Sequence, residues 1–378
     1  MGEQKRKNSF VFQAGILAAA GMLVKVISLI YRSPLLSILG LEGNNYYTAA
    51  IILLISSYSI PSAISKVIAQ RLAFREYRNA QRVFQCALLY VLVVGGAASL
   101  LTFVCAPYFV SKNPNAVTAL RVLAPTIFFS GFLGVFRGYF QAHRSMTHTS
   151  ISQVLEQIVN AAVSILAAYL LIKSVADKDG TTQAIYGSAG SAIGTGAGVL
   201  TGLLFMLWMY LINKDIIRRR VEHDRSEHVE SYRDIVRVIF TIVTPFILST
   251  FVYNCSTVVN MSLYYHLMDY RGVDAITYGN QYGIFATQAV SVVNIPIAIA
   301  SAMSSATIPT VSTTFARKEY AKTREQVTKA IQMTMLVSIP AMVGMAVLAR
   351  PIMQFIFPQK ESLELASGLL AALAVTVV

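Results

Sequence analysis

The chain contains little charge. Of its 378 residues only 13% are Asp, Glu, Lys or Arg, whereas 55% are hydrophobic, and the mean hydropathy is +0.58. A water-soluble protein of this length needs far more charge to cover its surface. Several nearly uncharged runs reach the length of about 18 residues or more that a transmembrane helix requires. The composition therefore excludes a soluble globular protein and predicts an all-α protein that crosses a membrane several times.

Cysteine is also scarce, and the motifs of common enzymes are absent. The three cysteines, Cys86, Cys105 and Cys255, lie in apolar runs without CxxC spacing, which is typical of small buried residues. The sequence has no HExxH, GxSxG or P-loop motif, and no acidic cluster that would hold Mg²⁺. We therefore predict that the protein is not an enzyme and holds neither a metal nor a cofactor.

Acidic residues are outnumbered, and the net charge is +13. The basic residues are scattered over many short loops instead of forming one face, which argues against a nucleic-acid partner. Loops on the side of the N-terminus carry more than twice as many Lys and Arg as loops on the other side. Because cytoplasmic loops collect these residues, we predict a cytoplasmic N-terminus. The basic start MGEQKRKNSF leads into an apolar helix without a cleavage site, so we expect an uncleaved first span.

Apolar runs predict nine full spans and the start of a tenth, near Leu363. The full spans are expected at residues 10–31, 46–70, 83–110, 116–140, 150–173, 183–213, 235–268, 275–306 and 327–348. The sixth contains GSAGSAIGTGAGVLTG, whose small residues allow close helix packing. We predict a six-helix lobe at 1–213, a cytoplasmic loop at 214–233 and a second lobe at 234–378. The chain stops at Val378 inside an apolar run, so we expect the second lobe to be incomplete.

An internal repeat supports two related halves. The stretch Ile60–Arg82 reads IPSAISKVIAQRLAFREYRNAQR, and Ile295–Gln326 contains IPIAIASAMSS followed by FARKEYAKTREQ. Pro61 corresponds to Pro296, and the triplet REY at 75–77 corresponds to KEY at 318–320. In membrane proteins, a repeat of this length suggests a transporter with its site between the halves.

Three cations in the first two predicted spans are candidate ligands for an anion. Lys25 and Lys66 lie inside the spans, where an uncompensated charge costs at least about 2.5–3.5 kcal/mol. Arg32 follows Lys25 by seven residues and therefore shares its helix face. No acid lies in these spans. The functional interpretation is a water-filled cavity that binds an anion, and the alternative is a lysine that snorkels or pairs within the bundle.

Other polar residues allow two interpretations each. Glu156 in the fifth span serves as counter-ion to a cation, or else binds a coupling ion. Asn280, Gln281 and Gln288 give the eighth span an uncharged polar face that suits sugar hydroxyls or amides, or else hydrogen bonds between helices. His143 and His148 lie beside Arg144 in a short predicted cytoplasmic loop, and the three form either a phosphate-binding patch or part of a solvated loop.

Five stretches together resemble the polysaccharide-exporter branch of the multidrug/oligosaccharidyl-lipid/polysaccharide flippase superfamily. They are most similar to the MurJ type of lipid II flippase and to stage V sporulation protein B. The stretches are KVISLIYRSPL (25–35), IPSAISKVIAQRLA (60–73), RGYFQAHRSMTHTSISQVLEQIV (137–159), VNIPIAIASAMSSATIP (293–309) and AMVGMAVLARPIMQFIF (341–357).

The resemblance implies a MATE-like fold of two six-helix lobes around a central cavity. It further implies alternating access, with basic residues of the first spans contacting the pyrophosphate of a lipid-linked sugar. Lys25 and Lys66 occupy such positions, and Arg32 lies close by. Some members have an arginine in the eighth span, where this chain has Asn280, Gln281 and Gln288, and an acid at the start of the second span, where this chain has asparagines.

Four functions are compatible with these features. The first is a lipid II flippase of the bacterial cytoplasmic membrane. The second is a flippase for another undecaprenyl-linked glycan, such as a capsule or teichoic-type unit. A cation-coupled drug exporter would need acids where Lys25 and Lys66 stand, and a scaffold that recruits cell-wall synthesis enzymes would leave both lysines without a role. With no ATP site visible, the membrane potential or a monovalent cation is the expected driving force, and the incomplete chain alone is expected to be inactive.

Overall fold

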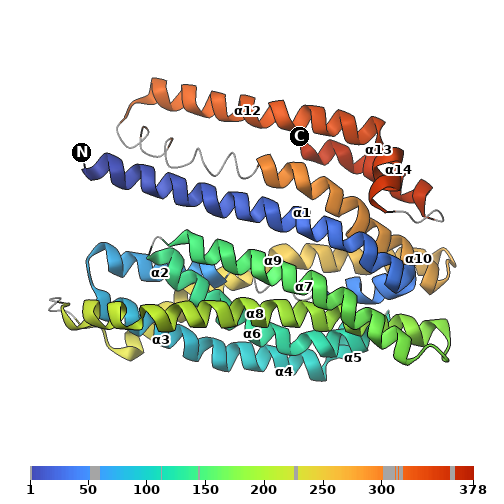
Figure 1. Ribbon diagram of the computed structural model, residues 1–378, viewed down its shortest axis with the longest axis horizontal. Coiled ribbons are helices and arrows are strands. Elements are labelled where there is room, and N and C mark those ends of the chain that lie inside the picture. Colours follow the sequence, from blue (N-terminus) through green and yellow to red (C-terminus); the bar gives the residue numbers. More distant parts are fainter. Residues whose placement is uncertain are drawn as a thin grey trace. The chain divides into compact units, whose positions relative to one another are not determined.

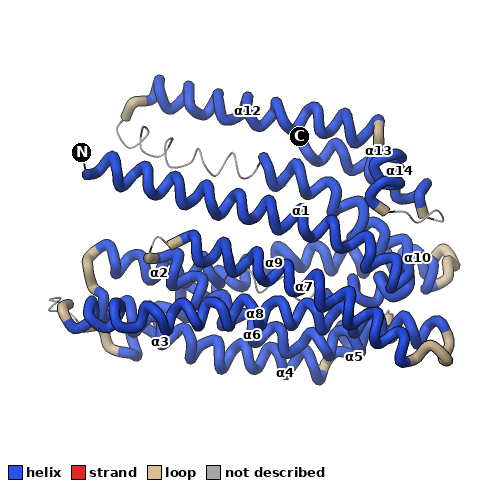
Figure 2. Tube along the Cα trace, in the orientation of Figure 1, coloured by secondary structure: helices blue, strands red, loops and turns tan. Residues whose placement is uncertain are grey.

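The computed structural model describes residues 2–51, 60–111, 113–143, 145–224, 229–300, 311, 314, 318–357 and 362–378. All secondary-structure elements in these residues are helices, and Figure 2 draws no strand among them. The all-helical fold class predicted from the composition is therefore confirmed for the described part of the chain.

Seven helical stretches of the described residues are long and apolar enough to cross a membrane. They are Ala19–Ile51, Tyr77–Val104, Pro114–Ala142, Met146–Ser174, Gly180–Glu222, Ala275–Ala300 and Tyr320–Val347. Each corresponds to a different predicted span, and Ala19–Ile51 also reaches the start of the second. The total of nine full spans and a tenth stays a prediction.

The other three predicted spans fall on different parts of the structure. The second, at 46–70, covers the end of α1 (Gly2–Ile51), residues outside the description and α2 (Ile60–Ala73). The seventh coincides with α9 (Tyr232–Tyr270). The tenth begins with α14 (Leu363–Leu373), part of a shorter apolar helix.

Packing divides the chain into two compact units. The larger unit is Ile38–Gly279, and the smaller unit joins Met1–Ser37 to Asn280–Val378. The larger unit contains η2 (Val91–Gly95), η3 (Pro114–Ala116) and the helices α2, α3 (Tyr77–Tyr90), α4 (Gly96–Val104), α5 (Ala106–Phe109), α6 (Val117–Ala142), α7 (Met146–Ser174), α8 (Gly180–Glu222) and α9. The lobes at 1–213 and 234–378 are defined by the predicted spans and not by packing, so they stay a prediction.

Two predicted loops are partly helical. The segment between the first two predicted spans continues α1, with a break at Gly40, where φ is 67° and ψ is −179°. Glycine adopts this conformation without the steric cost that other residues bear. Helix α8 continues to Glu222, so the first part of the predicted loop at 214–233 is helical as well.

The core of the larger unit lies around α6. This helix packs against α2, α4 and α8, and α7 and α8 run side by side along much of their length (Figure 1). Phe84 of α3 meets the rings of Phe136 and Tyr139 of α6 and of Tyr210 of α8, with centroids 4.5–5.4 Å apart. This aromatic cluster joins three helices that lie far apart in the sequence.

Glycines bring α7 and α8 into backbone contact, as the glycine-rich stretch predicts. A Cβ atom on Gly190 would lie 2.5 Å from the backbone nitrogen of Ala168, and one on Gly194 would lie 2.1 Å from Oγ of Ser164. A Cβ atom on Gly198 would lie 2.6 Å from the carbonyl oxygen of Glu156. Only glycine fits at these three positions while the two helices keep this distance.

The smaller unit contains the first part of α1 and the C-terminal helices. Its elements after Asn280 are the end of α10 (Ala275–Gly283), the π-helical η4 (Ile284–Ala289), α12 (Tyr320–Val347), α13 (Ala349–Ile356), α14 and η5 (Ala374–Val377). Helix α14 packs against α12, α13 and η4.

The two copies of the repeat share an unusual backbone conformation. Arg75 and Lys318, which correspond in the repeat, have φ angles of 62° and 59°. Glu76 and Glu319, which follow them, have φ and ψ of −81° and 70° and of −83° and 63°. Much of the second copy, at 301–310, 312–313 and 315–317, lies outside the described residues. Where both copies are described, the same residue pattern gives the same turn.

Candidate functional site

The two predicted cations of α1 belong to the smaller unit. Lys25 is exposed and Arg32 is half-buried. A guanidinium nitrogen of Arg32 donates a hydrogen bond of 3.0 Å to the carbonyl of Thr287 and another to Oγ of Ser291. Thr287 lies in η4, and π-helical turns inside longer helices occur frequently at functional sites. These bonds attach Arg32 to the span that carries the predicted polar residues.

Lys66 belongs to the larger unit and lies on α2. Its side chain is exposed, whereas the neighbouring Val67 and Ile68 are fully buried in the core. Lys66 therefore occupies the face of α2 that points away from the core of its own unit. That Lys66 and the cations of α1 bind one anion stays a prediction.

The predicted polar span contains two buried atoms that have no hydrogen-bond partner in the described part of the chain. They are Oδ1 of Asn280, an acceptor, and Nε2 of Gln288, a donor, and only 1% of Gln288 is exposed. Gln281 is half-buried on the same helix. A buried polar atom without a partner costs free energy, and a polar ligand or ordered water at this span would remove that cost.

Glu156 has a fixed partner. Its carboxylate pairs with the guanidinium of Arg137 at 2.7 Å, and Nε of Arg137 donates to Oγ of Ser152 at 2.8 Å. Gly202 of α8 leaves room for both side chains. Arg137 lies inside the fourth predicted span, and the structure buries it in α6, with 6% exposed. This arrangement is that of a counter-ion, one of the two interpretations of Glu156.

A second ion pair was not predicted from the sequence. Glu230, which precedes α9, pairs with Arg71 of α2 at 3.0 Å, and its backbone accepts a hydrogen bond from Arg82 and donates one to Asn79. The segment at 214–233, predicted as a loop, is thus attached to α2 and α3. The only sequence signal is the opposite charge of residues far apart in the chain.

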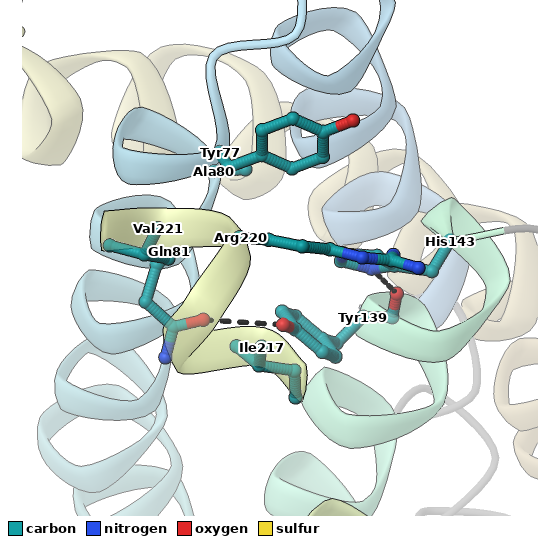
Figure 3. A pocket seen from close by; sticks show the side chains of 8 residues that line it. All are labelled: Tyr77, Ala80, Gln81, Tyr139, His143, Ile217, Arg220 and Val221. Carbon is teal, nitrogen blue, oxygen red and sulfur yellow. Dashed lines mark hydrogen bonds between the residues drawn. The ribbon is translucent and has the colours of Figure 1, made fainter. Parts of the chain in front are cut away.

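A small cavity lies at the adjoining ends of α3, α6 and α8 (Figure 3). Its volume is about 10 Å³, which fits one water molecule, and its walls include Tyr77, Tyr139, His143 and Arg220. Nδ1 of His143 donates to the carbonyl of Tyr139, and burial lowers the pKa of His143. Tyr139 donates through its hydroxyl to Gln81. His143 is therefore held against α6, while Arg144, its neighbour in the predicted patch, lies outside the described residues.

Comparison with known proteins identifies relatives over most of the chain. Residues 74–378 match the family model described as lipid II flippase MurJ. The lipid II flippase MurJ of Bacillus subtilis (strain 168) is 23% identical over 361 residues, which cover 90% of this chain and 65% of that protein. Stage V sporulation protein B of the same organism is 21% identical and covers 93% of this chain and 67% of that protein.

A solved structure shows the same fold. The inward-facing conformation of a multidrug resistance MATE family transporter of the MOP superfamily aligns with a TM-score of 0.67 and 16% identity, covering 97% of this chain and 80% of that one. This likeness agrees with the MATE-like fold that the sequence predicts. The chain belongs to the lipid II flippase MurJ family and is a multi-pass protein of the bacterial plasma membrane.

Proposed function

We propose that the protein is a flippase that moves an undecaprenyl-pyrophosphate-linked cell-wall precursor, lipid II, across the cytoplasmic membrane. The family match over residues 74–378 carries this proposal. The protein acts as a transporter and not as an enzyme, because it moves the precursor without changing its bonds. Its substrate is the lipid-linked precursor within the bilayer, and cell-wall synthesis enzymes are the expected functional partners.

The proposed substrate site combines cations with uncharged polar groups. Lys25, Arg32 and Lys66 bind the pyrophosphate, since several converging cations are needed where water is reduced. The exposure of both lysines is consistent with this role. Asn280, Gln281 and Gln288 bind the sugar or peptide part. The unpartnered Oδ1 of Asn280 and Nε2 of Gln288 support this role. Glu156 acts indirectly, by holding Arg137.

In alternating access this site opens first to one side of the membrane and then to the other. We place the N-terminus in the cytoplasm on the basis of loop charge and keep the predicted count of nine full spans and a tenth. The membrane potential acts on each moving charge with about 2.3 kcal/mol per 100 mV, so it is an available driving force without ATP. A monovalent cation is the alternative.

Complementation tests the function and the site together. A full-length gene that contains this sequence is expressed in a bacterium depleted of its own lipid II flippase, and growth and surface-exposed lipid II are measured. Wild type restores both, whereas Lys25→Ala and Lys66→Ala restore neither, because the pyrophosphate loses a cation. Lys178→Ala, which removes an exposed lysine between α7 and α8, is the matched control and rescues fully.

The outcomes separate function from site. Rescue by both lysine variants at equal membrane abundance retains the flippase and rejects the cationic site. Absence of rescue by wild type, with the protein present in the membrane, rejects lipid II as substrate.

The second candidate is a flippase for another lipid-linked glycan. The similarity to stage V sporulation protein B, at 21% identity over 93% of this chain, favours it. A drug exporter of the MATE type has the fold in its support, but this chain has Lys25 and Lys66 where a cationic drug requires acids. Restored surface display of a capsule or teichoic-type unit, without lipid II display, would establish the second candidate.

A further inference from the structure

A groove between α4 and α6 lies apart from the residues of the proposed substrate site. Its volume is about 240 Å³. Helix α4 lines it with Gly96, Ser99 and Phe103, and α6 lines it with Pro125 and the Phe128–Phe129 pair. All of these residues belong to the larger unit. The groove is therefore a feature of one compact body.

The walls of the groove offer no free polar group. The hydroxyl of Ser99 donates to the carbonyl of Ala124 at 2.8 Å and is thereby satisfied. A Cβ atom on Gly96 would lie in ordinary contact with the ring of Phe128, at 3.8 Å, so a longer side chain there would extend into the groove. Edge contacts with Phe129 and Phe132, at centroid distances of 5.7 and 4.9 Å, hold that ring in place. A water molecule would find no partner, so the groove suits hydrocarbon.

The groove faces the bilayer. Both of its helices belong to stretches long and apolar enough to span the membrane. At its rim, Leu100 is 64% and Phe103 is 48% exposed, so these side chains contact lipid and not the core of the unit. An acyl chain is the only abundant apolar molecule in that environment.

A cation stands at one end of the groove. Arg121 precedes Pro125 by one turn and Phe128 by two, so the three share a face of α6. Its guanidinium lies over the ring of Phe103, with 5.8 Å between the guanidinium carbon and the ring centroid. Arg121 is exposed and lies in the second turn of α6, close to the N-terminal end of that helix and hence near the headgroup level.

We propose that this groove binds one chain of an anionic phospholipid whose phosphate is held by Arg121. Guanidinium binds phosphate with two parallel hydrogen bonds. In the described part of the chain no carboxylate forms an ion pair with Arg121, so its guanidinium is available to a phosphate, and no paired acid beside it would favour the ammonium of a zwitterionic lipid. The bound lipid comes from the leaflet on the side of the α5–α6 turn.

Native mass spectrometry of the purified protein tests this lipid site. The protein is exchanged into micelles with equal amounts of phosphatidylglycerol and phosphatidylethanolamine, and retained lipids are counted. Wild type retains one phosphatidylglycerol with a preference of at least about tenfold, the size expected for a charged hydrogen-bonded pair. Arg121→Gln loses the preference, whereas Arg271→Gln, an exposed arginine in the turn after α9, retains it.

Blocking variants test the chain-binding part separately. Gly96→Leu places a side chain in the groove and reduces retention of both lipids roughly tenfold. Ser99→Leu places a side chain in the groove from a second position and should have the same effect. It replaces Gly96→Leu if thermal unfolding shows that Gly96→Leu does not fold. Unchanged retention in a folded blocking variant, or equal retention of the two lipids by wild type, overturns the proposal and leaves only exchangeable boundary lipid.

Discussion

In the larger unit, Gly190 and Gly194 of α8 are pressed against the backbone of α7, whereas a Cβ atom added to Gly344 of α12 or Gly368 of α14 in the smaller unit would meet no atom within 4 Å. The same residue type therefore has opposite consequences. Against α7, glycine permits a close helix–helix contact, as small residues do in membranes. In α12 and α14 it only lowers helix propensity.

The ion pairs of the two units also differ, because buried pairs are found in the larger unit and exposed pairs on α12. In the larger unit, Arg71–Glu230 and Arg137–Glu156 are mostly buried and join separate segments of the chain, whereas Arg218–Glu222 is exposed and lies within α8. In the described part of the smaller unit, the pairs are Lys322–Glu319 and Lys329–Glu325, both within one turn of α12 and largely exposed. A buried pair fixes the segments that it joins in one arrangement, because separating the charges would leave each one buried without a partner. An exposed pair does not, because water solvates its charges once they separate. The buried pairs therefore hold the segments of the larger unit together, whereas the exposed pairs of α12 add little stability.

The largest effect is expected from a side chain between α7 and α8. Gly194→Ala places a Cβ atom 2.1 Å from Oγ of Ser164 and forces the helices apart, at a cost of about 3 kcal/mol or more. Gly344→Ala meets open space and stabilises α12 by up to about 1 kcal/mol. Thermal unfolding in detergent micelles measures both. Equal shifts of the same sign would contradict the contrast between the units.

The second effect concerns the buried ion pair at the start of α9. Arg71→Leu leaves Glu230 without its charge partner, and we expect a loss of about 3 kcal/mol in unfolding free energy. The double variant Arg71→Leu, Glu230→Leu recovers most of that loss, because neither charge remains buried. Lys329→Ala, the matched change in an exposed pair, shifts stability by about 0.5 kcal/mol or less. A loss in the double variant equal to that of Arg71→Leu would show that the pair is not the cause.

These contrasts mark what the sequence could and could not predict. The helices and the close packing at GSAGSAIGTGAGVLTG follow from local composition, so both are predictable from the sequence. The pairing of Arg137 with Glu156 depends on how α6 packs against α7 and α8, which no local pattern encodes.

The candidate site was predictable to a similar degree. Charges inside apolar runs are conspicuous, so Lys25 and Lys66 could be selected from the sequence alone. The attachment of Arg32 to Thr287 joins two segments that lie 255 residues apart in the sequence and could not be anticipated. The π-helical turn that contains Thr287 also has no signature in residue spacing.

The third effect concerns a helix cap supplied from a distance. Glu76, the residue before α3, makes no capping hydrogen bond, and Asp224 instead accepts one of 2.6 Å from the backbone nitrogen of Arg78. Asp224→Ala should cost about 1 kcal/mol, the usual value for a lost N-cap. At α12 the corresponding Glu319 pairs, among the described residues, with the exposed Lys322, so Lys322→Ala should change little. Thermal unfolding of the two variants decides whether the first copy of the repeat alone depends on the 214–233 segment.

The smallest effect tests what the two copies share. Arg75 and Lys318 both adopt left-handed backbone angles, at a cost of about 1–2 kcal/mol for a residue with a Cβ atom. Glycine removes that cost but gains about 0.5–1 kcal/mol of freedom in the unfolded chain. Arg75→Gly and Lys318→Gly should therefore each stabilise the protein by about 0.5–1 kcal/mol, whereas Arg78→Gly, in the first turn of α3, should destabilise it. Because the gain comes from the backbone, it should be equal in the two copies although their surroundings differ. If one glycine variant raised the free energy of unfolding and the other lowered it, the two turns would share their sequence pattern but not their backbone strain.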